Sequence, residues 1–299
     1  MLVESFIKYI RYELNYSTCT VLSYSSDLKQ FVDFLTADTE LFDAESVTVN
    51  DVRAWMAKLM ADGCSVTTVK RKLQSLRAFY KYLMRVGKVQ KNPAREVEMA
   101  KVPHRLPECV KVENMEQMFS EQVDYDAFEE VRDRLIMLMM YSTGIRRSEL
   151  INLRDADVAD GELKVHGKRN KDRMVPFGDE LQAEIAIYRE LRNREVGETE
   201  WLFVRSNGEQ LYPTMVYRLA NKKLGDVGGC SRRSPHVLRH TFASSMLNNG
   251  AKLNSVKELL GHESLAATQV YTHITYRELK SNYEHAHPRA LKKRRMIWK

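Results

Sequence analysis

The sequence predicts a mainly α-helical protein with a small antiparallel β-sheet, arranged as two domains. Three observations lead to this expectation. Residues 1–87 carry apolar side chains at helical spacing. Residues 88–111 hold three of the seven prolines and show little periodicity, which is typical of a linker. Residues 112–299 contain helical patterns around two short alternating segments, and a chain of 299 residues is long enough for two domains.

Four helices are expected in the N-terminal domain, and Ser17 and Thr18 are candidate caps of the second. Their apolar positions are Phe6, Ile7, Ile10 and Leu14; Val21, Leu22, Leu28, Phe31, Val32 and Leu35; Val52, Trp55, Met56, Leu59 and Met60; and Val69, Leu73, Leu76, Phe79, Tyr80 and Leu83. The second domain is expected to be mixed. Its predicted elements are an apolar helix at 128–141 ending before Gly144, strands at 162–166 and 173–177 joined by a loop at 167–172, a third strand at 201–204, and mostly helix from 214 onward.

The positive charge is distributed unevenly. The net charge is +7, and the last eleven residues hold six basic residues and no acid, so the rest of the chain carries only +1. The segment 63–95 has nine basic residues and no acid. Such a segment is tolerated more easily beside a polyanion, although a solvated helix face is the other interpretation. The candidate DNA-binding residues on this predicted fourth helix are Lys70, Arg71, Lys72, Arg77 and Lys81.

Several classes of protein are disfavoured. The four cysteines show no CxxC pairing, so disulfides and zinc sites are not expected. No apolar run is long enough for a membrane span, and the N-terminus lacks the features of a signal peptide. We therefore expect a cytoplasmic protein without a membrane partner.

Three short motifs carry residues suited to phosphodiester chemistry: TGIRRSEL at 143–150, HVLRH at 236–240, and LGH followed by VYTH between 260 and 273. Each is weak alone, since Tyr271 is one of 14 tyrosines. Together they supply guanidinium groups that match phosphate oxygens and stabilise developing charge. Cations and a histidine favour deprotonation of the tyrosine, and a hairpin lysine such as Lys168 can protonate the leaving sugar oxygen.

In their order, the motifs TGIRRSEL, GKRNKDRMVP, HVLRHTFA, LLGH and VYTH resemble those of the tyrosine recombinases, also called the phage integrase family. The resemblance extends over nearly the whole chain and implies a four-helix, SAM-like core-binding domain followed by a catalytic domain. It implies catalytic roles for two phosphate-binding arginines (Arg146, Arg239), a general acid (Lys168), a histidine that supports proton transfer (His236), a phosphate-bonding histidine (His262) and the nucleophile (Tyr271), with Glu149 in support. Lys171 is the alternative to Lys168, and Arg169 stands where the family usually has glycine.

The resemblance also implies a reaction and its partners. Protomers bind a short duplex site with inverted half-sites, clamp it between the two domains, and assemble as a homo- or heterotetramer. The tyrosine forms a 3′-phosphotyrosine, and strands exchange through a Holliday junction without ATP, metal or any other cofactor. Within the family the chain is most similar to the Xer recombinases, nearer the C-type than the D-type. This implies resolution of chromosome dimers at cell division, with a second recombinase and a DNA-translocating motor as partners.

The same resemblance implies a C-terminal helix at 276–284 that is handed to a neighbouring protomer. The basic end, 292–299, is either a docking or DNA-contacting tail or a solubilising one. Four other functions share part of this pattern. An integrase or invertase of a mobile element shares these motifs, and a type IB topoisomerase shares the chemistry. A non-catalytic DNA-binding protein would not need Lys168, His236 and Tyr271 together. A metal hydrolase built on the histidines is opposed by Arg239, which would repel a dication.

Overall fold

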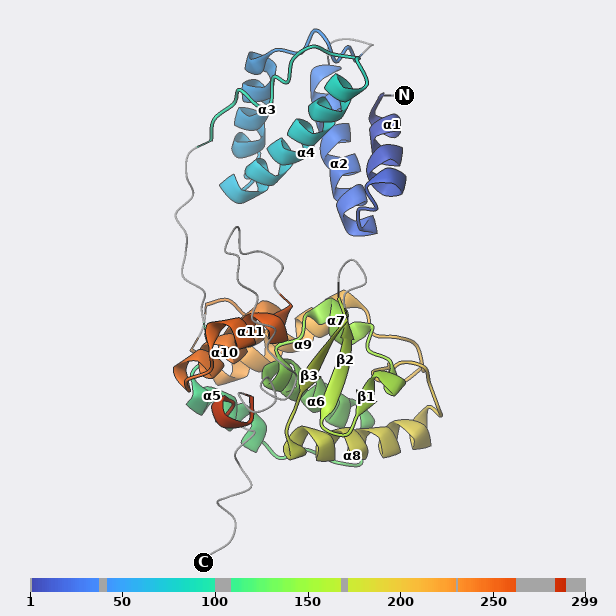
Figure 1. The fold of residues 1–299 in the computed structure, drawn as a ribbon, viewed down its shortest axis with the longest axis vertical. Coiled ribbons are helices and arrows are strands. Elements are labelled where there is room, and N and C mark those ends of the chain that lie inside the picture. Colours follow the sequence, from blue (N-terminus) through green and yellow to red (C-terminus); the bar gives the residue numbers. More distant parts are fainter. Residues whose placement is uncertain are drawn as a thin grey trace, which may run out of the picture. The chain divides into compact units, whose positions relative to one another are not determined.

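A computed structural model of the chain describes residues 2–37, 42–99, 109–167, 172–229, 231–261 and 283–288. The chain divides into two compact units, Met1–Arg105 and Leu106–Lys299 (Figure 1). Each unit has a hydrophobic core of its own. No helix within the described ranges is long and apolar enough to cross a membrane.

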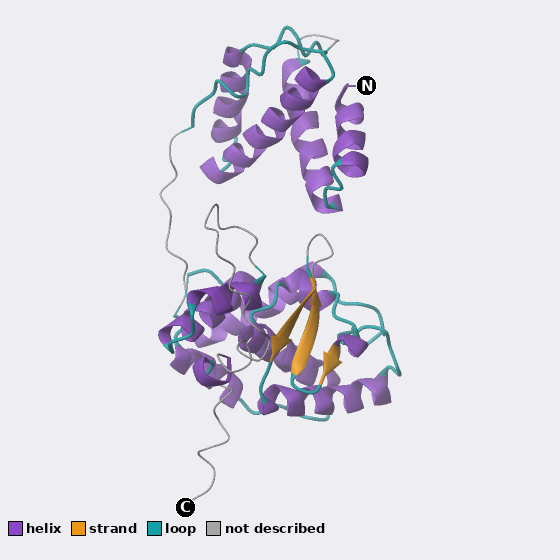
Figure 2. Ribbon diagram, viewed as in Figure 1, coloured by secondary structure: helices purple, strands orange, loops and turns teal. Residues whose placement is uncertain are grey.

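The first unit is helical. Its elements are α1 (Leu2–Lys8) with a π-helical extension at Tyr9–Glu13, α2 (Thr18–Leu35), α3 (Val49–Ala61) and α4 (Val66–Arg85). The side chains of Ser17, Thr48 and Ser65 cap α2, α3 and α4, because each accepts a bond from a backbone N–H of the first helical turn. The described part of this unit consists of helices and loops only (Figure 2). The four-helix prediction therefore matches the structure, apart from the π-helical turn.

Residues 88–99 pack against the first unit. Val89, Ala94 and Val97 are buried in its core. Arg77 on α4 holds this segment, since its Nε donates to the carbonyl oxygen of Ala94 at 2.9 Å and its Nη2 to that of Val97 at 2.7 Å. The first unit thus extends past residue 87, and residues 100–108 of the expected linker lie outside the described residues.

The second unit surrounds one buried helix. Its helices are α5 (Val112–Ser120), α6 (Phe128–Thr143), α7 (Arg147–Ile151), a 3-10 turn at Asp155–Asp157, α8 (Asp179–Glu195), α9 (Pro213–Val227), α10 (Pro235–Asn248) and α11 (Leu253–Leu260). From Leu135 to Thr143 every residue of α6 is buried, as expected for a helix covered on all sides. It packs against α7, α8, α9 and α10, so it forms the centre of the core.

A three-stranded antiparallel sheet in the order β1-β2-β3 completes the unit (Figure 2). Its strands are β1 (Val158–Ala159), β2 (Glu162–His166) and β3 (Asp172–Pro176). The two main strands lie where the sequence predicted them. The prediction of a strand at 201–204 was wrong, because Trp201 and Val204 form only isolated bridges, to Arg154 and Gln210. A two-residue strand at β1 is too short to leave a periodic pattern in the sequence.

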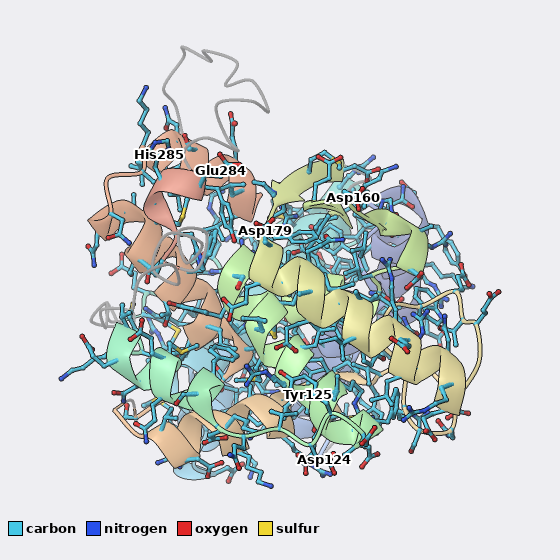
Figure 3. All side chains as sticks on the ribbon, turned by 90° about the horizontal axis from the view of Figure 1, so that it is seen from below. Asp124, Tyr125, Asp160, Asp179, Glu284 and His285 are labelled. Atoms are coloured by element: carbon cyan, nitrogen blue, oxygen red, sulfur yellow. The ribbon has the colours of Figure 1, made fainter. Side chains whose placement is uncertain are left out.

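Residues 283–286 form a short helical turn on the second unit. Tyr283, Ala286 and His287 are buried there, and the His287 ring lies 5.3 Å from the ring of Tyr141 and 5.6 Å from that of Phe242. Figure 3 shows the exposed Glu284 and His285 on the outer side of this turn. Of the helix expected at 276–284, residues 276–282 lie outside the described residues.

Candidate active site

The first phosphate-binding candidate, Arg146, follows directly from a glycine turn. The helix α6 ends at Gly144, whose φ of 63° lies in the left-handed region. A Cβ at this position would lie 2.5 Å from Cδ1 of Phe242 and 2.9 Å from Cδ2 of Leu260. Only glycine therefore allows α6, α10 and α11 to meet here. The chain then turns through the buried Ile145 and places Arg146 at the N-cap of α7.

Glu149 fixes Arg146 from the first turn of α7. One carboxylate oxygen, Oε2, accepts the backbone N–H of Arg146 at 2.7 Å, and Oε1 accepts Nη1 of its guanidinium at 2.7 Å. Burial raises the pKa of Glu149, but bonds and charge from Arg173 and bonds from Arg146 outweigh burial and lower it to about 2. Glu149 is therefore ionised at neutral pH and can orient Arg146, the supporting role expected from the sequence.

Arg239 lies on α10, which begins with Pro235 at its first turn. The guanidinium is buried and donates to two main-chain carbonyl oxygens, to Gly144 through Nη1 at 2.7 Å and to Leu260 through Nη2 at 2.5 Å. Burial, followed by the charge of Arg146, lowers the pKa of Arg239 to about 10. Arg239 therefore stays positively charged at neutral pH.

The two arginines converge on one helix end. Arg146 donates through Nη2 to the carbonyl oxygen of Gly261 at 2.9 Å, next to the Leu260 carbonyl that Arg239 binds. Each guanidinium uses two of its nitrogens in these bonds, and a guanidinium has five N–H groups. Both side chains are thus held rigidly while N–H groups remain for an anion. This preorganised pair suits a phosphodiester and its transition state.

His236 lies one turn before Arg239 on α10 and is exposed. Desolvation, followed by the charges of Arg147, Arg239 and Arg146, lowers its pKa below the ordinary value of 6.5. The ring is therefore neutral at pH 7 and able to accept a proton. His240, one further turn along, has its pKa lowered by the same kinds of cause. Within the described residues, no group of three His, Cys, Asp or Glu side chains could hold a metal ion.

Three of the expected catalytic residues lie outside the described residues: Lys168, His262 and Tyr271. The described chain reaches their immediate neighbours. His166 pairs with Asp172 as the last pair of the β2–β3 ladder, and Lys168 and Lys171 fall between these two residues in the sequence. Gly261 is left-handed at the C-terminus of α11 and directly precedes His262. The choice between Lys168 and Lys171 and the role of Tyr271 stay predictions.

The motifs did not assign a role to Arg173, although it is part of the second motif, GKRNKDRMVP. Its guanidinium binds both carboxylate oxygens of Glu149, at 3.0 and 2.8 Å, and the carbonyl oxygen of Leu259 at 2.8 Å. Leu259 is 86 residues away in the chain, so no local pattern could have revealed this contact. Arg173 thus belongs to the same charged cluster as Arg146.

The candidate DNA-binding residues of α4 differ in their surroundings. Arg71 and Lys72 both bind the buried carboxylate of Asp27 on α2, at 2.8 and 3.0 Å. Arg77 is engaged with main-chain carbonyls, Lys70 is half-buried, and Lys81 is exposed. These contacts give Arg71, Lys72 and Arg77 structural roles. Lys81 is the residue of this set most available to a phosphate.

Comparisons with known structures define the class of fold. The chain is similar to the structure of a lambda integrase (75–356) dimer bound to a COC′ core site, with a TM-score of 0.67, 16% identity, and 91% of this chain and 98% of that chain covered. It is similar to the XerH site-specific recombinase bound to a difH substrate, with a TM-score of 0.67, 20% identity, and 94% and 82% covered. The fold is therefore that of the integrase-type recombinases, and the predicted fold class is confirmed.

Sequence comparisons identify the family. Residues 109–278 match the phage integrase family, and residues 3–87 match the phage integrase N-terminal SAM-like domain. Tyrosine recombinase XerC of Chlorobaculum tepidum is 37% identical, covering 95% of this chain and 94% of the relative. The XerC of Listeria monocytogenes serotype 4a is 40% identical, covering 97% and 98%. The chain belongs to the phage integrase family of tyrosine recombinases, and the resemblance seen in the motifs, including its nearness to XerC, is confirmed.

Proposed function

We propose that this enzyme recombines DNA at a specific site with Tyr271 as its nucleophile, in the manner of its XerC relatives. The observation that carries the proposal is the pair Arg146 and Arg239. Both are anchored on the carbonyls at the end of α11, and both keep N–H groups for a phosphate. The chain continues from this helix end through His262 to Tyr271, so the nucleophile follows the phosphate pocket in sequence.

In the proposed reaction, the Tyr271 oxygen attacks the scissile phosphorus and the bond from phosphorus to the 5′ oxygen breaks. Arg146 and Arg239 stabilise the charge that develops on the phosphate oxygens. His236, neutral at pH 7, supports removal of the phenol proton, and His262 bonds to the phosphate. Lys168 protonates the departing 5′ oxygen. The 3′-phosphotyrosine conserves the bond energy, so a 5′ hydroxyl of the second duplex can attack it without ATP.

The biological role follows from the relatives. Those named XerC are similar over almost the whole chain, and resolution of chromosome dimers at cell division is the role we propose here. Two protomers would bind the inverted half-sites of each duplex, and a tetramer would hold two duplexes. We propose that a second recombinase supplies half of the tetramer and that a DNA-translocating motor activates it. The enzyme would act in the cytoplasm, where the chromosome lies.

The test uses a plasmid with two directly repeated copies of a candidate site. The site is a fragment of the host chromosome selected because the protein binds it. Incubation in EDTA, alone and with the candidate partner recombinase, should convert one circle into two. Relaxation of supercoils without exchange would indicate a topoisomerase instead. Loss of all cleavage in EDTA, with recovery on adding zinc or magnesium, would indicate a metal-dependent hydrolase.

A further inference from the structure

Arg173 lies near the start of β3, directly after the hairpin connection, and its side chain is only 12% exposed. All three guanidinium nitrogens donate hydrogen bonds: Nη1 and Nη2 to the two carboxylate oxygens of Glu149, and Nε to the carbonyl oxygen of Leu259. A two-pronged arginine–carboxylate pair of this kind is geometrically specific. Arg173 therefore acts as an internal brace, meaning that it holds Glu149 and the end of α11 in place and does not face a ligand.

The charges of the cluster show what this brace does. Glu149 is 6% exposed and is shared between Arg146 and Arg173. With Arg146 alone, the buried carboxylate would cancel the charge that Arg146 should offer to a phosphate. With Arg173 as a second partner, the three groups together carry +1, and Arg239 adds a further positive charge. The loss of this one positive charge matters more in a buried cluster than at the surface, because charges interact more strongly where water is excluded.

The main-chain contacts show a second effect. Three consecutive carbonyl oxygens at the end of α11 each accept from a different arginine: Leu259 from Arg173, Leu260 from Arg239 and Gly261 from Arg146. The last turn of a helix leaves its C=O groups without partners inside the helix, and within the described residues these arginines donate to them. A Cβ on Gly261 would lie 3.1 Å from Nη1 of Arg173, so the brace packs directly under the residue before His262.

We propose that Arg173 is a positioning residue of the recombination site. It balances the charge of Glu149 and holds the end of α11, so that Arg146 keeps both its place and its charge for the scissile phosphate. This inference rests on the proposed function. It differs from a purely structural role in one respect: the need for Arg173 should fall when the carboxylate of Glu149 is removed.

The test is the rate of covalent adduct formation on a nicked suicide substrate at saturating DNA, for the unmodified chain and four variants. Arg173→Gln should slow adduct formation about 10- to 100-fold, the range found where residues that orient the ligands of a metal ion are removed. Arg173→Lys retains the charge and should lose less. The double variant Arg173→Gln with Glu149→Gln should be at least about fivefold faster than Arg173→Gln alone, because no buried carboxylate then cancels the charge of Arg146.

The fourth variant is a matched control. Arg189 on α8 also binds a carboxylate, Asp155, and main-chain carbonyls within the same unit, so Arg189→Gln removes a similar set of bonds away from the site. It should leave the saturated rate near that of the unmodified chain. Melting temperature and DNA affinity are measured for every variant. If Arg173→Gln unfolds, Arg173→Lys takes its place. The comparison is then between Arg173→Lys alone and Arg173→Lys combined with Glu149→Gln.

A substrate with sulfur in place of the 5′ bridging oxygen separates the two halves of the chemistry, since a thiolate leaves without a proton. Adduct formation by Arg173→Gln should remain slow on this substrate, because the substitution impairs Arg146 and not the proton donor. Full recovery would show that Arg173 acts through the hairpin lysine and would overturn the inference. So would a double variant no faster than Arg173→Gln, or an Arg173→Gln rate equal to that of the unmodified chain. No adduct from the unmodified chain would instead overturn the proposed function and the inference with it.

Discussion

The charged residues of the site are held mainly by the protein backbone. Arg239 bonds to the carbonyls of Gly144 and Leu260, and Arg146 bonds to that of Gly261. Backbone acceptors cannot change rotamer, so the guanidinium groups are set before any substrate arrives. Such preorganisation is the usual source of electrostatic catalysis in enzymes. Preorganised guanidinium groups of this kind are what the proposed reaction requires from the protein.

The lowered pKa of His236 gives a prediction at this scale. Since its pKa lies below 6.5, the neutral base should persist at pH 6.5, and the rate at limiting DNA should fall only at more acidic pH. Replacing Arg147 by Gln removes the second-largest cause of the lowering and should move this acidic limb to higher pH. The measurement is the pH profile of adduct formation, with His236→Gln as the control that lacks the limb. A limb unmoved in Arg147→Gln would contradict this assignment.

Individual residues differ in how far the sequence could predict them. Arg146, Glu149, His236 and Arg239 were predicted from motifs. The structure bonds Arg146 to Glu149 and anchors Arg146 and Arg239 on neighbouring carbonyls, those of Gly261 and Leu260. Arg173 escaped because its contacts join segments 24 and 86 residues apart. The basic residues of α4 were nominated by charge alone. Charge does not distinguish a cation facing solvent from one that neutralises a buried carboxylate such as Asp27.

At the level of secondary structure, the site depends on helix ends. The C-terminus of α6, the N-terminus of α7 and the C-terminus of α11 meet around Gly144 and Gly261. The sequence predicted α6 and the helical region that contains α11, because apolar periodicity and glycine stops are local signals, but it did not predict the five-residue α7. It did not predict the π-helical turn at Tyr9–Glu13 or the short strand β1, because neither leaves a periodic pattern. Their positions are set by tertiary packing.

Gly144→Ala tests the junction of the three helix ends. An alanine must adopt a left-handed φ and push against Phe242 and Leu260, so it should destabilise the second unit by about 2–4 kcal/mol. The control is Gly197→Ala, whose φ of 92° is also left-handed but whose Cβ would meet nothing within 4 Å. It should cost only about 1–2 kcal/mol. Urea unfolding measures both, and equal losses would show that packing at Gly144 is unimportant.

The surface of α4 gives a second prediction at the level of elements. Lys81 is exposed, so Lys81→Gln should reduce the slope of log affinity against log salt by about 1 without lowering stability. Arg77→Gln loses the bonds to Ala94 and Val97 and should instead destabilise the first unit by about 1–3 kcal/mol. Salt titrations of DNA binding and urea unfolding measure these effects. An unchanged slope in Lys81→Gln would favour a solvated helix face.

At the scale of the whole molecule, the chain combines two units with separate cores, and the second unit holds the cluster of Arg146, Glu149 and Arg173. The match to the family extends over both units, at 3–87 and 109–278. Composition alone could not have identified this, since most of the net charge lies in the last eleven residues. The order of the five motifs did, and the family match confirms the resemblance that they carry. The mechanism proposed here depends on the residue that follows this pocket, Tyr271.

The most direct test is to map the covalent adduct. The chain is incubated with a nicked suicide substrate bearing its site, the complex is digested, and the peptide attached to DNA is identified by mass spectrometry. The account predicts a 3′-phosphate ester on Tyr271, and a Tyr271→Phe variant that binds the site with unchanged affinity but forms no adduct. An adduct on another residue, or one that persists in Tyr271→Phe, would contradict it.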